Sequence, residues 1–139
     1  MKKQIFISTG EVSGDLHGSL LAKELFDESS KRAIDLEIYG LGGEKMREAG
    51  VQIIKDTTPI SAIGIWEAVP LVLPMIKIQQ RFMKVLISKS PNCLILIDYM
   101  GPNISIGRNL KKKKLNVPIF YYIAPQEWAW RVGNNSTTD

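Results

Sequence analysis

The sequence predicts an α/β protein built on a doubly wound parallel sheet, and three observations predict it. Strand-like and helix-like segments alternate along most of the 139 residues, as they do in βαβ units. Residues 93–97, CLILI, form a continuous apolar run that is typical of a strand buried on both faces. Glycine-containing turns at residues 10–14 and 40–43 directly follow two of the predicted strands. Right-handed crossovers would place helices on both faces and give a Rossmann-like domain.

The first half of the chain supplies three strands and two helices. Runs of apolar residues predict strands at 4–9, 35–39 and 51–54. Leucines recur at helical spacing over residues 16–29, which predicts the first helix. A short helix is expected over 44–49, because Gly50 fits the stop position that follows a helix.

The second half continues the alternation. Residues 75–88 predict a longer helix, and 93–97 the central strand. A helix over 103–115 ends in lysines, as the helix dipole prefers. Residues 117–123 predict a fifth strand, and the tail 132–139 is polar without periodicity.

Composition excludes several classes of protein. Apolar residues make up 45% and charged residues 23% of the chain, as in a globular domain. Cys93 is the single cysteine, which excludes an internal disulfide and a cysteine-based metal site. No apolar run reaches the roughly 18 residues of a membrane span. Glu11 and Asp15 interrupt the N-terminal stretch that would otherwise suggest a secretory signal, so we expect a cytoplasmic protein.

The charges are distributed unevenly along the chain. Residues 1–69 hold eight basic and eleven acidic side chains, whereas residues 70–139 hold ten basic and three acidic ones. A positive half of this kind favours anionic partners, which include lipid headgroups, phosphates and nucleic acid.

Four segments rich in glycine or polar residues follow predicted strands, and they are 10–15, 40–43, 98–103 and 125–131. The carboxyl ends of parallel strands meet at one edge of a sheet, and ligands of such sheets bind there. Segments that are distant in sequence therefore converge, which predicts a binding site at this edge.

The turn GEVSGD at residues 10–15 has two interpretations. Gly10 and Gly14 permit positive φ and close backbone approach, and free N–H groups at the helix start would attract an anion or a sugar hydroxyl. Alternatively, it is a plain tight turn in which Ser13 or Asp15 caps the helix. The turn matches neither G-x-G-x-x-G nor G-x-x-x-x-G-K, so neither NAD nor ATP is expected, and we predict no cofactor.

Asp98 is the candidate catalytic residue. It follows the most apolar strand and is the only acid between Pro70 and Gln126. A carboxylate at the sheet edge is a candidate general base. The alternative is a helix cap or a hydrogen-bond acceptor for the loop 99–102. His17, the single histidine, lacks partners for a metal site and is expected at the surface, so we predict no metal.

Two further segments are unusual. Residues 125–131, PQEWAWR, offer flat apolar area for sugars or acyl chains, although the tryptophans could instead pack in a core.

Residues 68–76 carry two prolines and no charge, and the following helix carries cations on one face, as interfacial membrane helices do. The alternative is an amphipathic crossover helix that packs on the sheet. The candidate membrane-contact residues are Trp66, Val69, Leu71, Val72, Leu73, Met75, Ile76, Lys77, Arg81 and Phe82.

Taken together, these motifs resemble the lipid-A-disaccharide synthase family of glycosyltransferases. The family carries a G-E-x-S-G-D turn like residues 10–15, and a G-x-G-G turn like 40–43. Its I-D-x-P-x-F-N segment corresponds to residues 97–103 of this chain, and its Y-Y-x-x-P-x-x-W-A-W-R segment corresponds to residues 121–131. The resemblance covers essentially the whole chain. Gly101 stands where many members have a second acid.

The resemblance implies a two-domain GT-B fold. Residues 1–131 would form the N-terminal, acceptor-side domain, and residues 132–139 a tail leading to a C-terminal nucleotide-sugar domain that this chain lacks. It also implies an inverting, metal-independent transfer of 2,3-diacylglucosamine from its UDP conjugate to 2,3-diacylglucosamine 1-phosphate, with release of UDP. We expect a peripheral protein on the cytoplasmic side of the inner membrane, no nucleic-acid partner, and no activity from these 139 residues alone. A homodimer of the full-length protein is compatible with the resemblance.

The resemblance also implies roles for single residues. Asp98 would be the base that removes the proton from the acceptor 6-hydroxyl. The expected substrate-contact residues are Glu11, Ser13, Gly14, Asp15, Gly42, Gly43, Asn103, Gln126, Trp128 and Arg131. Two alternatives stay open: another GT-B enzyme acting on a lipid-linked acceptor, or a non-catalytic membrane-binding module.

Overall fold

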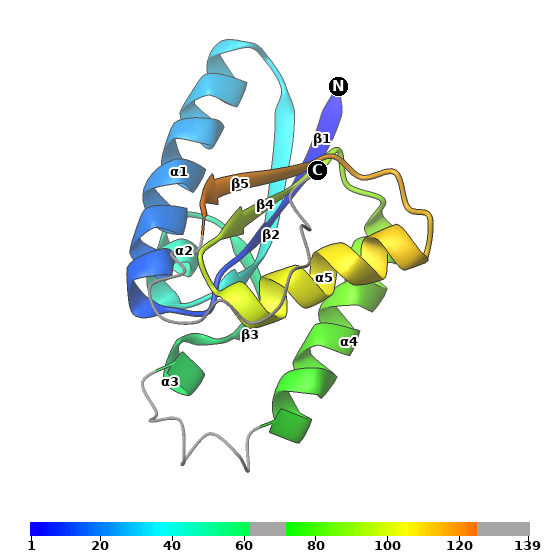
Figure 1. The fold of residues 1–139 in the computed structure, drawn as a ribbon. Coiled ribbons are helices and arrows are strands. Elements are labelled where there is room, and N and C mark those ends of the chain that lie inside the picture. The colour runs from blue at the N-terminus through cyan, green and yellow to red at the C-terminus, as the bar shows by residue number, and fades with distance from the viewer. Residues whose placement is uncertain (62–71, 125–139) are drawn as a thin grey trace.

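The computed structural model describes residues 1–61 and 72–124 (Figure 1). The elements are β1 (Lys2–Ser8), α1 (Val12–Lys31), β2 (Asp35–Gly42), α2 (Glu44–Glu48), β3 (Gln52–Asp56), α3 (Thr58–Ser61), α4 (Val72–Lys89), β4 (Cys93–Ile97), α5 (Met100–Lys112) and β5 (Ile119–Ile123). The five strands form one parallel sheet in the order β3-β2-β1-β4-β5. This order is that of the doubly wound Rossmann type, so the predicted fold class is confirmed.

Helices cover both faces of the sheet, with α1 and α2 on one side and α4 and α5 on the other (Figure 1). The face under α4 and α5 is built on Phe6, whose ring stacks on Tyr39 at a centroid distance of 5.2 Å and meets Phe82 edge-on at 5.6 Å. The opposite face buries Ile7 and Ile97 against Met46 of α2 and other side chains. Alternation along each central strand sends neighbouring residues into the two cores, because side chains of a strand point to opposite faces.

Each predicted strand and helix is present, and the differences lie at the ends. The first helix begins at Val12 and not at residue 16, because the glycine turn is already part of its first turn. The helix expected from residue 103 begins at Met100. Pro102 is tolerated there because the first N–H groups of a helix have no intrahelical acceptor. The four-residue α3 was not predicted, since a single turn has no periodicity to detect.

Helix α4 presents two different faces. Phe82 and Leu86 are fully buried in the core beneath the helix, whereas Leu73 is 71% exposed and Ile76 43% exposed. Phe82 is therefore wrong as a membrane-contact residue, because it lies inside the domain against Phe6. None of the helices in the described ranges is both long and apolar enough to cross a bilayer.

Candidate functional site

Three of the four polar segments meet at the carboxyl edge of the sheet, as predicted. Residues 10–15 follow β1, residues 40–43 end β2, and residues 98–103 follow β4 (Figure 1). The fourth segment, 125–131, lies outside the described residues. Buried polar side chains concentrate at this edge, where Ser8, Thr9, Asp15, Thr57 and Asn103 are each at most 4% exposed. Burying polar groups is unfavourable unless they are hydrogen-bonded, so their partners define what this edge does.

The glycines of the first turn serve close packing. A Cβ atom on Gly10 would lie 2.2 Å from the ring of Tyr99, and one on Gly14 would lie 1.8 Å from Oγ1 of Thr9. Real Cβ atoms do not approach other atoms so closely, so a side chain at either position would force Tyr99 or Thr9 to move. Neither residue adopts a positive φ, which corrects one of the two reasons expected for these glycines.

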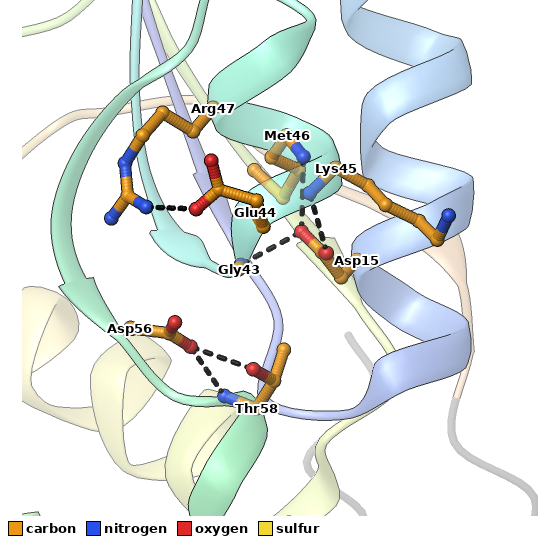
Figure 2. A network of polar contacts seen from close by, with 8 residues as sticks. All are labelled: Asp15, Gly43, Glu44, Lys45, Met46, Arg47, Asp56 and Thr58. Atoms are coloured by element: carbon orange, nitrogen blue, oxygen red, sulfur yellow. Dashed lines mark hydrogen bonds and ion pairs between the residues drawn. The ribbon is translucent and has the colours of Figure 1, made fainter.

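Asp15 holds the second turn to the first helix, as Figure 2 shows. Its Oδ1 accepts hydrogen bonds from the N–H groups of Gly43 (2.7 Å) and Met46 (3.1 Å), and its Oδ2 accepts one from Lys45 (3.0 Å). These donors are the free N–H groups at the start of α2, whose N-cap residue is Gly43 and has no side chain to cap them. Asp15 therefore caps a helix that lies 28 or more residues away in sequence.

This contact corrects two expectations for Asp15. Helix α1 has no side-chain cap, so neither Ser13 nor Asp15 caps it. Asp15 is also 4% exposed with both oxygens engaged, which leaves no free face for a substrate. Gly42 and Gly43 are buried beside it, and a Cβ on Gly42 would meet Sδ of Met46 at 2.4 Å. Close packing accounts for these glycines without a ligand.

The turn after β4 is strained. Asp98 and Tyr99 both adopt left-handed backbone conformations, with φ of 44° and 55°, at a cost of roughly 1 to 2 kcal/mol per residue. Asp98 is half-buried and its backbone N–H donates to the carbonyl of Ile123 at 2.8 Å. Strain of this kind in successive residues occurs mainly at functional sites. Two successive left-handed residues could not be predicted here, because neither residue is glycine.

Asn103 lies beneath this turn and is fully buried. Its Nδ2 donates to the carbonyl oxygens of Asp98 (2.6 Å), Ser8 (3.3 Å) and Ile97 (3.4 Å). Its Oδ1 accepts a hydrogen bond from Oγ of Ser8 at 2.7 Å. Asn103 is therefore wrong as a substrate-contact residue, because every polar atom of its side chain is used inside the protein.

Electrostatic interactions at this edge couple Glu11 to Asp98 and to Tyr99. Burial and the charge of Asp98 raise the pKa of Glu11 above its usual 4.5. Burial and the charge of Glu11 raise the pKa of Tyr99. Glu11 is the N-cap residue of α1 and is half-buried, and Ser13 is exposed on the first turn of the same helix. Tyr99 was missed from sequence, although its place beside Asp98 was a signal that could have found it.

Thr9 is a second residue that the sequence did not single out. It is fully buried, and its carbonyl accepts a hydrogen bond from Oγ1 of Thr57 at 2.7 Å. Its own Oγ1 has no hydrogen-bond partner among the described residues. Such an unpaired buried hydroxyl is unfavourable by about 1 to 3 kcal/mol and adds to the strain of this edge.

The remaining predicted residues fall into three groups. Glu11, Ser13 and Asp98 stay candidates for substrate contact or catalysis. Lys77 and Arg81 are exposed on α4, Met75 is half-buried, and Val72 begins the helix. Gln126, Trp128, Arg131, Trp66, Val69 and Leu71 lie outside the described residues. His17 is exposed on α1, as expected, and the described residues contain no cluster of three or more His, Cys, Asp or Glu side chains arranged to hold a metal ion.

Comparisons with known proteins identify relatives of the whole chain. Residues 5–137 match the family model described as lipid-A-disaccharide synthetase. A lipid-A-disaccharide synthase from Prochlorococcus marinus is 51% identical over 135 residues, which is 97% of this chain and 34% of that protein. The enzyme of the same name from Gloeothece citriformis is 47% identical over 98% of this chain and 35% of its own length. The chain thus spans about a third of the length of the curated relatives it matches.

A solved structure is similar at a lower level. It is the UDP-GlcNAc 2-epimerase from Neisseria meningitidis bound to UDP-GlcNAc, with a TM-score of 0.48 and 11% sequence identity, over 86% of this chain and 32% of that one.

Replacing Asp15 with asparagine tests its structural role. Asp15→Asn removes the charge that compensates the start of α2 and turns one acceptor into a donor that faces an N–H group. We expect the free energy of unfolding to fall by about 1 to 3 kcal/mol in urea denaturation. Asp27→Asn, an exposed position on the same helix, is the control and should change it by less than about 0.5 kcal/mol. Equal effects of the two substitutions would contradict the capping role.

Glu11 should make the stability of the protein depend on pH. Because its folded pKa lies above 4.5, folding favours the protonated form, and this contribution is lost as the pH rises through the folded pKa. We expect the free energy of unfolding of Glu11→Gln, relative to that of the unchanged protein, to increase as the pH rises from about 4 to about 7. Urea denaturation at both pH values measures this, with the exposed Glu24→Gln on α1 as control. A pH-independent difference would rule the explanation out.

Proposed function

This chain belongs to the lipid-A-disaccharide synthetase family, and from that premise we propose that it forms the acceptor-side part of a lipid-A-disaccharide synthase. In the proposed reaction, 2,3-diacylglucosamine is transferred from its UDP conjugate to 2,3-diacylglucosamine 1-phosphate. Because the chain spans about a third of its relatives' length, the nucleotide-sugar site would lie in sequence beyond residue 139. We expect the 139 residues alone to have no transferase activity.

The observation that carries the proposal is the position, backbone conformation and partial exposure of Asp98. This carboxylate stands at the carboxyl edge of a parallel sheet, where such sheets bind their ligands, on a backbone held in the left-handed region. It is partly open to solvent, whereas Asp15 and Asn103 at the same edge are buried and fully hydrogen-bonded. Asp98 and Glu11 are both partly accessible acids of this edge, so a substrate could reach them.

The proposed chemistry uses Asp98 as a general base. The acceptor 6-hydroxyl attacks the anomeric carbon of the donor, a new carbon–oxygen bond forms there, and the bond to the UDP oxygen breaks with inversion. The hydroxyl proton passes to the Asp98 carboxylate as the attack proceeds, and UDP leaves as the anion. Glu11 and Ser13 would contact the acceptor sugar from the start of α1, where helix N–H groups also favour an anion or a hydroxyl.

Helix α4 supports a second part of the proposal, which is attachment to the surface of the inner membrane. Leu73 and Ile76 are exposed at its first turns, and Lys77, Arg81 and Lys84 are exposed further along the helix. Apolar side chains that enter the headgroup layer together with cations that attract anionic lipids are the features of an interfacial helix. An acceptor with two acyl chains resides in a membrane, so the enzyme must reach it there.

Substituting Asp98 in the full-length enzyme tests the catalytic assignment. Asp98→Asn keeps the shape of the side chain and removes the base, so we expect kcat to fall by about 10²-fold or more. Release of UDP measures turnover. Asp35→Asn, at the opposite end of the sheet and exposed, should keep normal activity. Near-normal turnover by Asp98→Asn would refute the assignment.

Vesicle flotation tests the membrane face. We expect the double variant Leu73→Glu and Ile76→Glu to lose most binding to vesicles of phosphatidylglycerol and phosphatidylethanolamine, because each glutamate replaces an inserted apolar side chain with a repelled charge. The matched control is Leu16→Glu with Leu20→Glu, two exposed leucines of α1, which should leave binding unchanged. Equal binding of both double variants would exclude α4 as the contact.

A further inference from the structure

Asn103 stands out among the buried side chains because it donates a hydrogen bond to the backbone carbonyl of Asp98. Its carboxamide joins the end of β1 to the end of β4, through Ser8 on one side and through Ile97 and Asp98 on the other. Ser8 and Asn103 are 95 residues apart in sequence. The shortest of the four hydrogen bonds, 2.6 Å, is the one to the Asp98 carbonyl.

The geometry requires an amide at this position. Three carbonyl oxygens converge on Nδ2, so only a donor fits there, while Oδ1 meets the hydroxyl of Ser8. A carboxylate of the same shape would place an acceptor against three acceptors. An apolar side chain would leave the part-buried Asp98 carbonyl without this donor.

The backbone conformation of the turn that Asn103 contacts is not favoured by the residues of the turn themselves. Asp98 and Tyr99 are both left-handed without being glycine, so their backbone is held there by surrounding contacts. Within residues 1–61 and 72–124, two hydrogen bonds reach the backbone of Asp98: its N–H donates to Ile123, and its carbonyl accepts from Asn103. The hydrogen bond from Asn103 fixes the peptide group that follows the Asp98 side chain, and hence the direction in which that side chain leaves the backbone.

We infer that Asn103 is a positioning residue, whose carboxamide holds the Asp98 turn in its strained conformation and so fixes where the Asp98 carboxylate lies at this edge. The catalytic consequence rests on the proposed function, in which Asp98 is the base. The placement itself does not, and it is measurable in the 139-residue chain without any turnover.

Glu11 provides the reporter for this placement. The charge of Asp98 contributes to the raised pKa of Glu11, so a carboxylate that moves away must lower that pKa. Titration followed by NMR of the side-chain carboxyl carbons measures it. Asp98→Asn sets the scale, because it removes the charge altogether. We expect Asn103→Ala to produce about half or more of that fall, whereas Asn109→Ala on the same helix should produce none.

Two further variants keep the result decisive. Ser8→Ala removes only the hydrogen bond to Oδ1 of Asn103, and we expect a smaller fall in the pKa of Glu11. If Asn103→Ala does not fold, Ser8→Ala tests the positioning role in its place. In the Asp98→Asn background, Asn103→Ala should change the pKa of Glu11 no further. A further fall there, or an unchanged pKa in both Asn103→Ala and Ser8→Ala, would overturn the inference.

Kinetics of the full-length enzyme separate this inference from the proposed function. Asn103→Ala should lower kcat roughly tenfold with KM for the acceptor nearly unchanged, because a displaced base weakens the chemical step more than binding. Normal kcat in Asn103→Ala beside an inactive Asp98→Asn would refute the positioning role and leave the proposed function standing. Near-normal turnover by Asp98→Asn would refute the role of Asp98 as the base, while the titrations would still decide the placement.

Discussion

One buried carboxylate connects the parts of the chain that form the edge of the sheet. Asp15 lies on α1, but the three N–H groups that donate to it belong to Gly43 and to the first turn of α2. The partial positive charge at the start of α2 compensates the buried anion, so the two groups stabilise each other where either alone would be unfavourable. Because α1 follows β1 and α2 follows β2, this contact fixes two successive βα units against each other. This contact also explains the glycines at positions 42 and 43, because side chains there would fill the space that the carboxylate and Met46 occupy.

The same edge concentrates features that reduce stability. Asp98 and Tyr99 are strained, the Thr9 hydroxyl is buried without a partner, and Glu11 is held where its charge is disfavoured. The other left-handed non-glycine residues of the described domain, Ala33, Ser90 and Lys114, each follow the end of a helix, where this conformation is common. One apolar core lies on each face of the sheet. Unfavourable groups gathered at one end of an otherwise consistent fold are typical of a site maintained for function.

The fold was largely predictable because its signals are local. The apolar run at 93–97 and the helical spacing of leucines after residue 15 each depend on neighbours in sequence, and the parallel sheet follows from their alternation. The site was predictable only in position. Strand ends could be located from sequence, but the partner of Asp15 lies 28 or more residues away and that of Asn103 lies 95 away. The resemblance therefore assigned both side chains to a substrate, whereas the structure shows both hydrogen-bonded within the protein.

The contact between Gly10 and Tyr99 has a consequence for how such sequences can diverge. A side chain at position 10 would occupy the space of the tyrosine ring, so neither position is free to change alone. A larger residue at 10 becomes acceptable only after 99 has become small, and a small residue at 99 leaves a void unless 10 grows. The two positions, 89 residues apart, form an epistatic pair, and related sequences should show them changing together or not at all.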